Sequence, residues 1–295
     1  RNGGSAHAPD RKHHAGASRT ISPEAGAPAS RYHRRFFRLW MRPMTMTLLD
    51  AALLLVAGLA AGFVNTIAGG GGLFTLAALL FMGVPADLAN GTNRVSVALQ
   101  SAEGVRGFHR HGVLDTAAIV PILWPTLSGS LIGSVLASFL PVTLLKPLLL
   151  GTMMGMALLM ILKPAVMAPP EGTAPFALAD RPAGWAALFG AGLYGGFIQG
   201  GVGFLLLAGL VGVLRYPLVQ ANALKLVCTG VFGVVALAVF AARGQVLWLP
   251  GLVIAAGTLV GVRLSVDFAV KARHETLRVL LLAAVIGVCV ASFFR

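Results

Sequence analysis

The sequence predicts an all-α fold: a polytopic membrane helix bundle of about eight spans, built from two homologous repeats with glycine-broken helices. The first observation is composition, because hydrophobic residues make up 57% and charged residues only 11% of the 295 residues, with a mean hydropathy of +0.82. Soluble domains do not have this composition. The second observation is that glycine clusters interrupt two apolar segments, at Gly69–Gly72 and Gly195–Gly203.

The third observation is that motifs recur in the same order in both halves of the chain. Pro217 and Asn222 stand 132 residues after Pro85 and Asn90. Glycine pairs with the GxxxG spacing, which lets helices pack closely, recur 128 residues apart, as Gly129 with Gly133 and Gly257 with Gly261. We therefore expect two repeats. An odd number of spans per repeat would make them inverted, and an even number parallel.

These patterns divide the chain into four parts. Residues 1–46 form a basic tail that we expect to be disordered, because residues 1–42 hold nine Lys or Arg and little apolar sequence. Residues 164–182 form a Pro-rich linker. This linker separates the first transmembrane repeat, residues 47–163, from the second repeat, residues 183–295.

The net charge of +13 does not indicate a nucleic-acid partner. About half of the excess lies in the tail, next to the first apolar span, where the positive-inside rule expects basic residues. We therefore expect a multi-pass protein of the cell inner membrane with a cytoplasmic tail. The expected partners are the lipid bilayer and a small anionic substrate.

Each repeat is expected to contain a span, a break, a short segment and further spans. The expected helices of the first repeat are 48–67, 73–84, 89–109, 115–140 and 142–162. Those of the second repeat are 184–200, 204–214, 221–242, 247–269 and 277–294. The segments 73–84 and 204–214 are too short to cross a bilayer alone, which is typical of discontinuous or re-entrant helices.

The helix at 89–109 is half polar. At 100° per residue, one half of its circumference carries Asn90, Asn93, Arg94, Ser96, Gln100 and Glu103. A membrane helix with such a stripe should face the bundle interior or a water-filled cavity. Glu103 could relay protons, but a salt bridge to a nearby basic residue is the better interpretation. Arg263 and Asp267, spaced i, i+4, are expected to form a structural ion pair.

The glycine breaks are the candidate substrate site. They expose backbone amides and helix N-termini near mid-membrane, where the positive end of the helix dipole suits an anion. Glycine that only permits tight helix crossing is the alternative. Arg94 and Lys225 would supply charge, or else snorkel to the interface. The full set of candidate substrate-binding residues is Asn65, Thr66, Gly69, Gly70, Gly71, Gly72, Asn90, Asn93, Arg94, Gln199, Gly200, Gly201, Gly203, Asn222 and Lys225.

Other classes of site find little support in the sequence. His109 and His111 do not share a helix face, and no cysteine or carboxylate is placed to complete a metal site. Gly190, Gly192 and Gly195 spell GxGxxG inside an apolar helix without the flanking strand that a nucleotide site needs. We expect no enzyme activity, no cofactor and no metal. Cys228 and Cys289 are expected to be buried and unpaired.

Five features of the sequence occur together: AGFVNTIAGGGGL at 61–73, NGTNR at 90–94, Arg110–Gly112, the paired GxxxG segments, and GGFIQGGVG followed by Asn222–Lys225. In these features the chain resembles the TauE/SafE family of sulfite exporters and toluene-sulfonate-uptake permeases. The resemblance covers about residues 47–294. It implies a bacterial inner-membrane carrier, of roughly seven to nine spans, for sulfite, sulfonates or related sulfur-containing anions.

The predicted function is therefore a secondary transporter for a small sulfur-containing oxyanion. Residues 64–72 and 197–203 would supply backbone donors. Alternating access would come from one repeat rocking against the other. The alternatives are a passive anion channel, a membrane scaffold, and a transporter of an unrelated small solute, including a cation.

Overall fold

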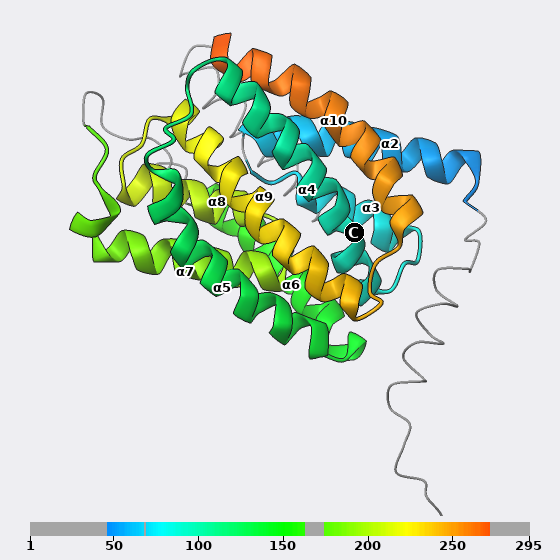
Figure 1. Ribbon diagram of the computed structural model, residues 1–295. Coiled ribbons are helices and arrows are strands. Elements are labelled where there is room, and N and C mark those ends of the chain that lie inside the picture. Colours follow the sequence, from blue (N-terminus) through cyan, green and yellow to red (C-terminus); the bar gives the residue numbers. More distant parts are fainter. Residues whose placement is uncertain (1–45, 68, 163–173, 272–295) are drawn as a thin grey trace, which may run out of the picture.

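The computed structural model describes residues 46–67, 69–162 and 174–271, in which every regular element is a helix (Figure 1). The first half contains α2 (Leu48–Ile67), α3 (Gly72–Phe81), α4 (Ala86–Arg110), α5 (Ile119–Phe139) and α6 (Val142–Leu162). The second half contains the 3₁₀ turn η2 (Leu178–Asp180), α7 (Pro182–Phe197), α8 (Val202–Leu207), the π-helical η3 (Ala208–Val213), α9 (Leu218–Ala242) and α10 (Trp248–Lys271).

The all-α prediction is confirmed. Four of the helices in the described ranges, α2, α5, α9 and α10, are long and apolar enough to cross a membrane. The two breaks occur where they are predicted, between α2 and α3 and between α7 and α8. The span predicted at 277–294, Cys289 and the basic tail lie outside the described residues.

The half-polar helix α4 lies inside the bundle, as its sequence predicts. It packs against both α9 and α10, and α3 covers part of its first half (Figure 1). Asn90, Asn93 and Arg94 are all 0% exposed. Polar groups at this depth require partners inside the protein, so α4 carries most of the polar interactions described below.

The helices beside α4 define two ends of the bundle. Gly251 of α10 lies against Val95, and Gly107 lies against Val266, so α4 and α10 run in the same direction. We call the end at which both finish the His111 end, and the end at which both begin the Pro85 end. α9 runs the opposite way, because its residue Phe240 lies near the start of α4.

Glycines set the close crossings of the outer helices. In α2, Gly58 and Gly62 face Ile254 and Thr258 of α10, while Gly257 and Gly261 of α10 face the backbone of α2. Residues of α5 and α7 make the same arrangement, namely Gly129 and Gly133 with Gly192 and Gly196. An added Cβ would overlap a backbone carbonyl oxygen at each of these positions. The predicted close packing at both GxxxG pairs is confirmed.

Each short helix leads back toward the end from which its chain entered. α2 runs beside α10 from the Pro85 end, and α3 then ends just before α4 begins at that same end. α7 runs beside α5 from the His111 end, and α8 with η3 ends just before α9 begins there (Figure 1). The two broken segments therefore enter the bundle from opposite ends.

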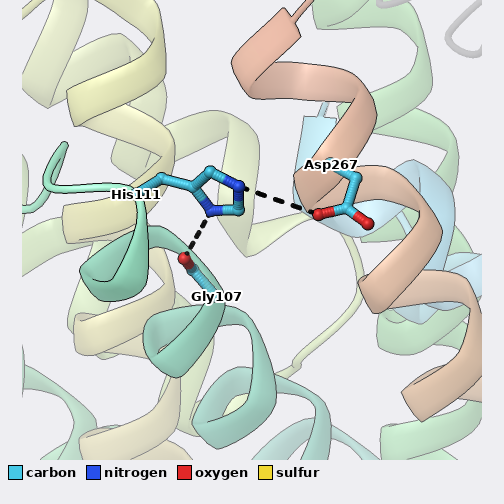
Figure 2. A network of polar contacts seen from close by, with 3 residues as sticks. All are labelled: Gly107, His111 and Asp267. Atoms are coloured by element: carbon cyan, nitrogen blue, oxygen red, sulfur yellow. Dashed lines mark hydrogen bonds and ion pairs between the residues drawn. The ribbon is translucent and has the colours of Figure 1, made fainter.

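The predicted ion pair between Arg263 and Asp267 is wrong. Arg263 Nε instead donates to Glu103 Oε1 of α4 at 2.7 Å, which confirms a salt bridge for Glu103 but with a partner 160 residues away. His111 Nε2 lies 3.9 Å from Asp267 Oδ1, and its Nδ1 lies 2.9 Å from the Gly107 carbonyl oxygen (Figure 2). A basic residue four positions before an acidic one opposes the helix dipole, so the local pair is the weaker choice.

Candidate functional site

The two glycine breaks touch each other. Gly69 has a φ of 91°, which favours glycine. A Cβ added at Gly203 would overlap the Gly69 backbone, and one added at Gly70 would overlap the Phe204 ring. The first break and the second break therefore contact each other through main chain, with no room for a side chain between them.

Arg94 extends from α4 to the C-terminal end of α7. Its Nη1 donates to the carbonyl oxygen of Gly195 and to Oε1 of Gln199. Its Nη2 donates to the carbonyl oxygen of Gly196 at 2.9 Å and to Oδ1 of Asn90 at 3.3 Å. A planar guanidinium can bind several acceptors at once, and a cation at a helix C-terminus is favourable. Arg94 thus caps the broken helix of the other half.

Lys225 caps the broken helix of the first half. Its Nζ donates to the carbonyl oxygens of Asn65 and Thr66 at the C-terminal end of α2, at 2.7 and 3.0 Å. The third donation is to Oδ1 of Asn222 at 2.7 Å. An ammonium group has three N–H donors, and all three are occupied here. Arg94 and Lys225 therefore cap the two broken helices crosswise.

The two cations form separate centres along the bundle. Arg94 lies over the Phe240 ring, with Cζ 5.3 Å from the centroid. Gly104 lies against Leu226, which places Lys225 about ten residues further along α4 than Arg94. At 1.5 Å per residue this is an axial separation of roughly 15 Å between the backbone positions of the two residues. We call the two groups the Arg94 centre, with Asn90, Asn93 and Gln199, and the Lys225 centre, with Asn65, Thr66 and Asn222.

The N-terminus of α3 faces the Arg94 centre. A Cβ added at Gly72 would lie 3.4 Å from Asn93 Nδ2 and 3.4 Å from the Gln199 carbonyl oxygen. The Asn93 amide is oriented by Thr75, whose Oγ1 donates to Asn93 Oδ1 at 2.6 Å. Asn93 Nδ2 consequently points toward the first turn of α3 and finds no partner.

Comparison with known proteins identifies the family of this chain. A family model described as sulfite exporter TauE/SafE matches residues 54–292. The chain belongs to the TauE/SafE family.

Three curated relatives carry transporter names. The probable membrane transporter protein ORF9 of Sinorhizobium sp is 27% identical over 241 residues, which cover 81% of this chain and 90% of the relative. A probable membrane transporter protein of Haemophilus influenzae is 29% identical over 221 residues, or 72% and 83% of the two chains. The probable membrane transporter protein YfcA of Escherichia coli K12 is 26% identical over 237 residues, or 80% and 86%. No solved structure matches the chain. The family and the apolar helices make this chain a multi-pass membrane transporter-family protein.

The buried polar atoms without a hydrogen-bond partner in the described part of this TauE/SafE chain are donors at the two centres and acceptors elsewhere. Six buried side-chain N or O atoms in the described residues have no hydrogen-bond partner. The three that belong to the two centres are all donors: Asn93 Nδ2, Arg94 Nε and Asn222 Nδ2. The other three are all acceptors: Asp87 Oδ1, Gln100 Oε1 and Gln245 Oε1. An unpaired buried donor costs roughly 1–3 kcal/mol, and a ligand rich in acceptors would remove that cost.

The charges at the centres have the same sign. Arg94 and Lys225 are both 0% exposed, whereas none of the aspartates and glutamates within the described ranges is buried. Carbonyl and amide oxygens surround both cations, and no described carboxylate pairs with either one. A buried cation without a counter-ion is costly, and both centres carry that cost.

The structure places the predicted residues near the breaks, and several of their neighbours are missed by sequence reasoning. Tyr194 Oη donates to the Gly200 carbonyl oxygen at 2.6 Å and so fixes the second break. Phe240 supplies an aromatic face to Arg94, and Thr75 orients Asn93. These residues have no distinctive spacing in the sequence, because their partners lie on other helices.

Proposed function

We propose that this chain is a secondary transporter that moves a small sulfur-containing oxyanion, such as sulfite or a sulfonate, across the bacterial inner membrane. The observation that carries the proposal is the donor excess at the breaks: two fully buried cations and three unpaired N–H groups, with no ion pair from a described carboxylate to either cation. An oxyanion offers several acceptor oxygens and negative charge, which complement both features. A cation as substrate would meet repulsion at both centres.

The proposed mechanism is alternating access between two inverted repeats. Residues 48–139 and 182–271 present the same order of helix, break, short helix and two long helices. Corresponding helices run in opposite directions, as α4 and α9 do, and the outer helix of each half packs on the last long helix of the other. Inverted repeats around a site formed by broken helices are common in secondary transporters. Rocking of one repeat would open the breaks to one end at a time.

The direction of insertion is a further part of the proposal. The basic tail precedes α2 at the Pro85 end, and its arginines would place that end in the cytoplasm. The opposite end carries its own basic residues, namely Arg110, Arg181, Arg215 and Lys271. Single cysteines at Thr116 and Thr143, one exposed position at each end, would be compared in a cysteine-free background. If the tail is cytoplasmic, a membrane-impermeant thiol reagent added outside the inner membrane should label Thr116→Cys and should not label Thr143→Cys.

A flux assay tests the proposed function and separates it from a channel. The purified full-length chain would be reconstituted in liposomes and supplied with ³⁵S-sulfite, with sulfate and taurine as competitors. A carrier predicts saturable uptake that is accelerated by unlabelled sulfite inside the vesicles. Uptake that rises linearly with concentration and shows no counterflow would indicate the passive anion channel. Absence of uptake for sulfite and for both competitors would reject the substrate class.

A further inference from the structure

The Arg94 and Lys225 centres are too far apart to bind the same small anion. Their backbone positions lie roughly 15 Å apart along the bundle, and their side chains extend to different helix ends, Arg94 to α7 and Lys225 to α2. This spacing exceeds the size of sulfite or of a sulfonate group. We propose that the chain binds two oxyanions in series, one at the Arg94 centre and one at the Lys225 centre. This inference rests on the proposed transport of an oxyanion, but it adds a second binding site to it.

The Arg94 centre has the donors for one anion. Asn93 Nδ2 and Arg94 Nε are buried and unpaired, and both belong to side chains that are 0% exposed. The hydrogen bond that Asn93 Oδ1 accepts and those that the other nitrogens of Arg94 donate already hold the two side chains in place. The anion would therefore enter a preformed group of donors beside the first turn of α3.

The Lys225 centre has an equivalent donor. Asn222 Oδ1 accepts a hydrogen bond from Lys225 Nζ at 2.7 Å, which identifies the other amide atom as nitrogen. That nitrogen is buried without a partner, and the side chain is 0% exposed. An anion at Asn222 Nδ2 would lie next to the ammonium group without displacing its three bonds. Asn93 and Asn222 thus have the same role in their respective centres.

The charge at each centre also permits its own anion. A helix C-terminus contributes about half a negative charge. The capping of α7 by Arg94 and of α2 by Lys225 therefore leaves each centre positive by about half a charge. Gln199 belongs to one centre and Thr66 to the other, and the Gly69–Gly203 contact lies a few residues beyond each of them. That contact would separate the two bound anions.

Binding stoichiometry tests the inference directly. The purified full-length chain in detergent would be titrated with ³⁵S-sulfite. Wild type is expected to bind two anions per chain. Asn93→Asp and Asn222→Asp keep the accepting oxygen but replace the donor by a carboxylate oxygen, so each variant should bind one anion, and the double variant none. Arg263→Gln removes an exposed cation outside both centres and should still bind two.

The possible outcomes separate this inference from the proposed function. Binding of one anion per wild-type chain, abolished equally by Asn93→Asp and by Asn222→Asp, would establish a single shared site and overturn the inference while leaving anion transport intact. No measurable sulfite binding by a folded wild-type chain would overturn both. Thermal unfolding of every variant is measured in parallel, and only variants that unfold cooperatively are compared.

Discussion

The Arg94 and Lys225 centres perform the same task with different chemistry. Each cationic side chain extends from the first half of a long helix and caps the carbonyl end of the broken helix in the other half of the chain. Arg94 uses a planar fork that binds four acceptors and stacks over Phe240, while Lys225 uses a point charge that binds three. In both halves, a buried cation from the other half satisfies the terminal carbonyl groups of the broken helix, and the number of acceptors matches the donors on the terminal nitrogens of that cation.

The two breaks also differ in their backbone. The first contains four consecutive glycines, with a positive φ at Gly69, whereas Val202 interrupts the second, with its positive φ at Gly201. The helix after the first break is α-helical, but the one after the second changes to a π-helix at Ala208. The backbone conformations of the two breaks therefore differ, so substitutions at equivalent positions should have unequal effects.

Among substitutions that keep the charge or the fold, replacing either cation by the other type should have the largest effect. Arg94→Lys leaves at least one of four acceptors without a donor, and each charge-assisted hydrogen bond contributes about 1.5–3 kcal/mol. We expect sulfite flux in proteoliposomes to fall at least about tenfold and thermal stability to fall with it. Lys225→Arg must fit a larger group among three acceptors and should lose flux as well. Full activity in either variant would show that charge alone suffices.

Substitution at the contact between the breaks should come next. Gly203→Ala would force the two backbones apart, and overpacking of this kind costs about 1–3 kcal/mol. Flux should fall severalfold while the chain still folds. Gly190→Ala is the matched control, because Gly190 also lies inside a helix, α7, but has nothing within 4 Å of an added Cβ. If the control reduces flux as much as Gly203→Ala does, the replacement of a helical glycine in general, and not this contact, is responsible.

Loss of the Glu103–Arg263 ion pair should have the smallest effect. The Arg263 side chain is 66% exposed, and exposed ion pairs contribute about 0–1 kcal/mol. Arg263→Gln should therefore change the unfolding midpoint and the sulfite flux very little. A large loss of flux would show that this ion pair contributes to transport.

Local pattern is sufficient to predict much of this fold. The lengths of the apolar segments predict the bounds of the helices Leu48–Ile67 and Val142–Leu162 to the residue, and the glycine clusters predict the positions of both breaks. The stripe on α4 correctly predicts a helix facing the interior. Each of these features depends on residues that are near one another in the sequence, where helix periodicity applies.

Features that depend on the other half of the chain could not be predicted. The backbone acceptors of Arg94 lie about a hundred residues away and those of Lys225 about 160. The sequence therefore suggests both cations at one substrate site, whereas the structure places them in two centres. The partner of Arg263 is missed for the same reason. A repeat in sequence indicates that two halves are related, but it does not specify which side chains cross from one half to the other.

The most direct test of anion transport at the breaks is ³⁵S-sulfite flux in proteoliposomes for three single variants. Arg94→Ala and Lys225→Ala each remove one buried cation, while Arg263→Ala removes an exposed one. We predict that flux is lost in the first two variants and kept in the third, with all three chains folded. Wild-type flux in Arg94→Ala and Lys225→Ala would contradict it.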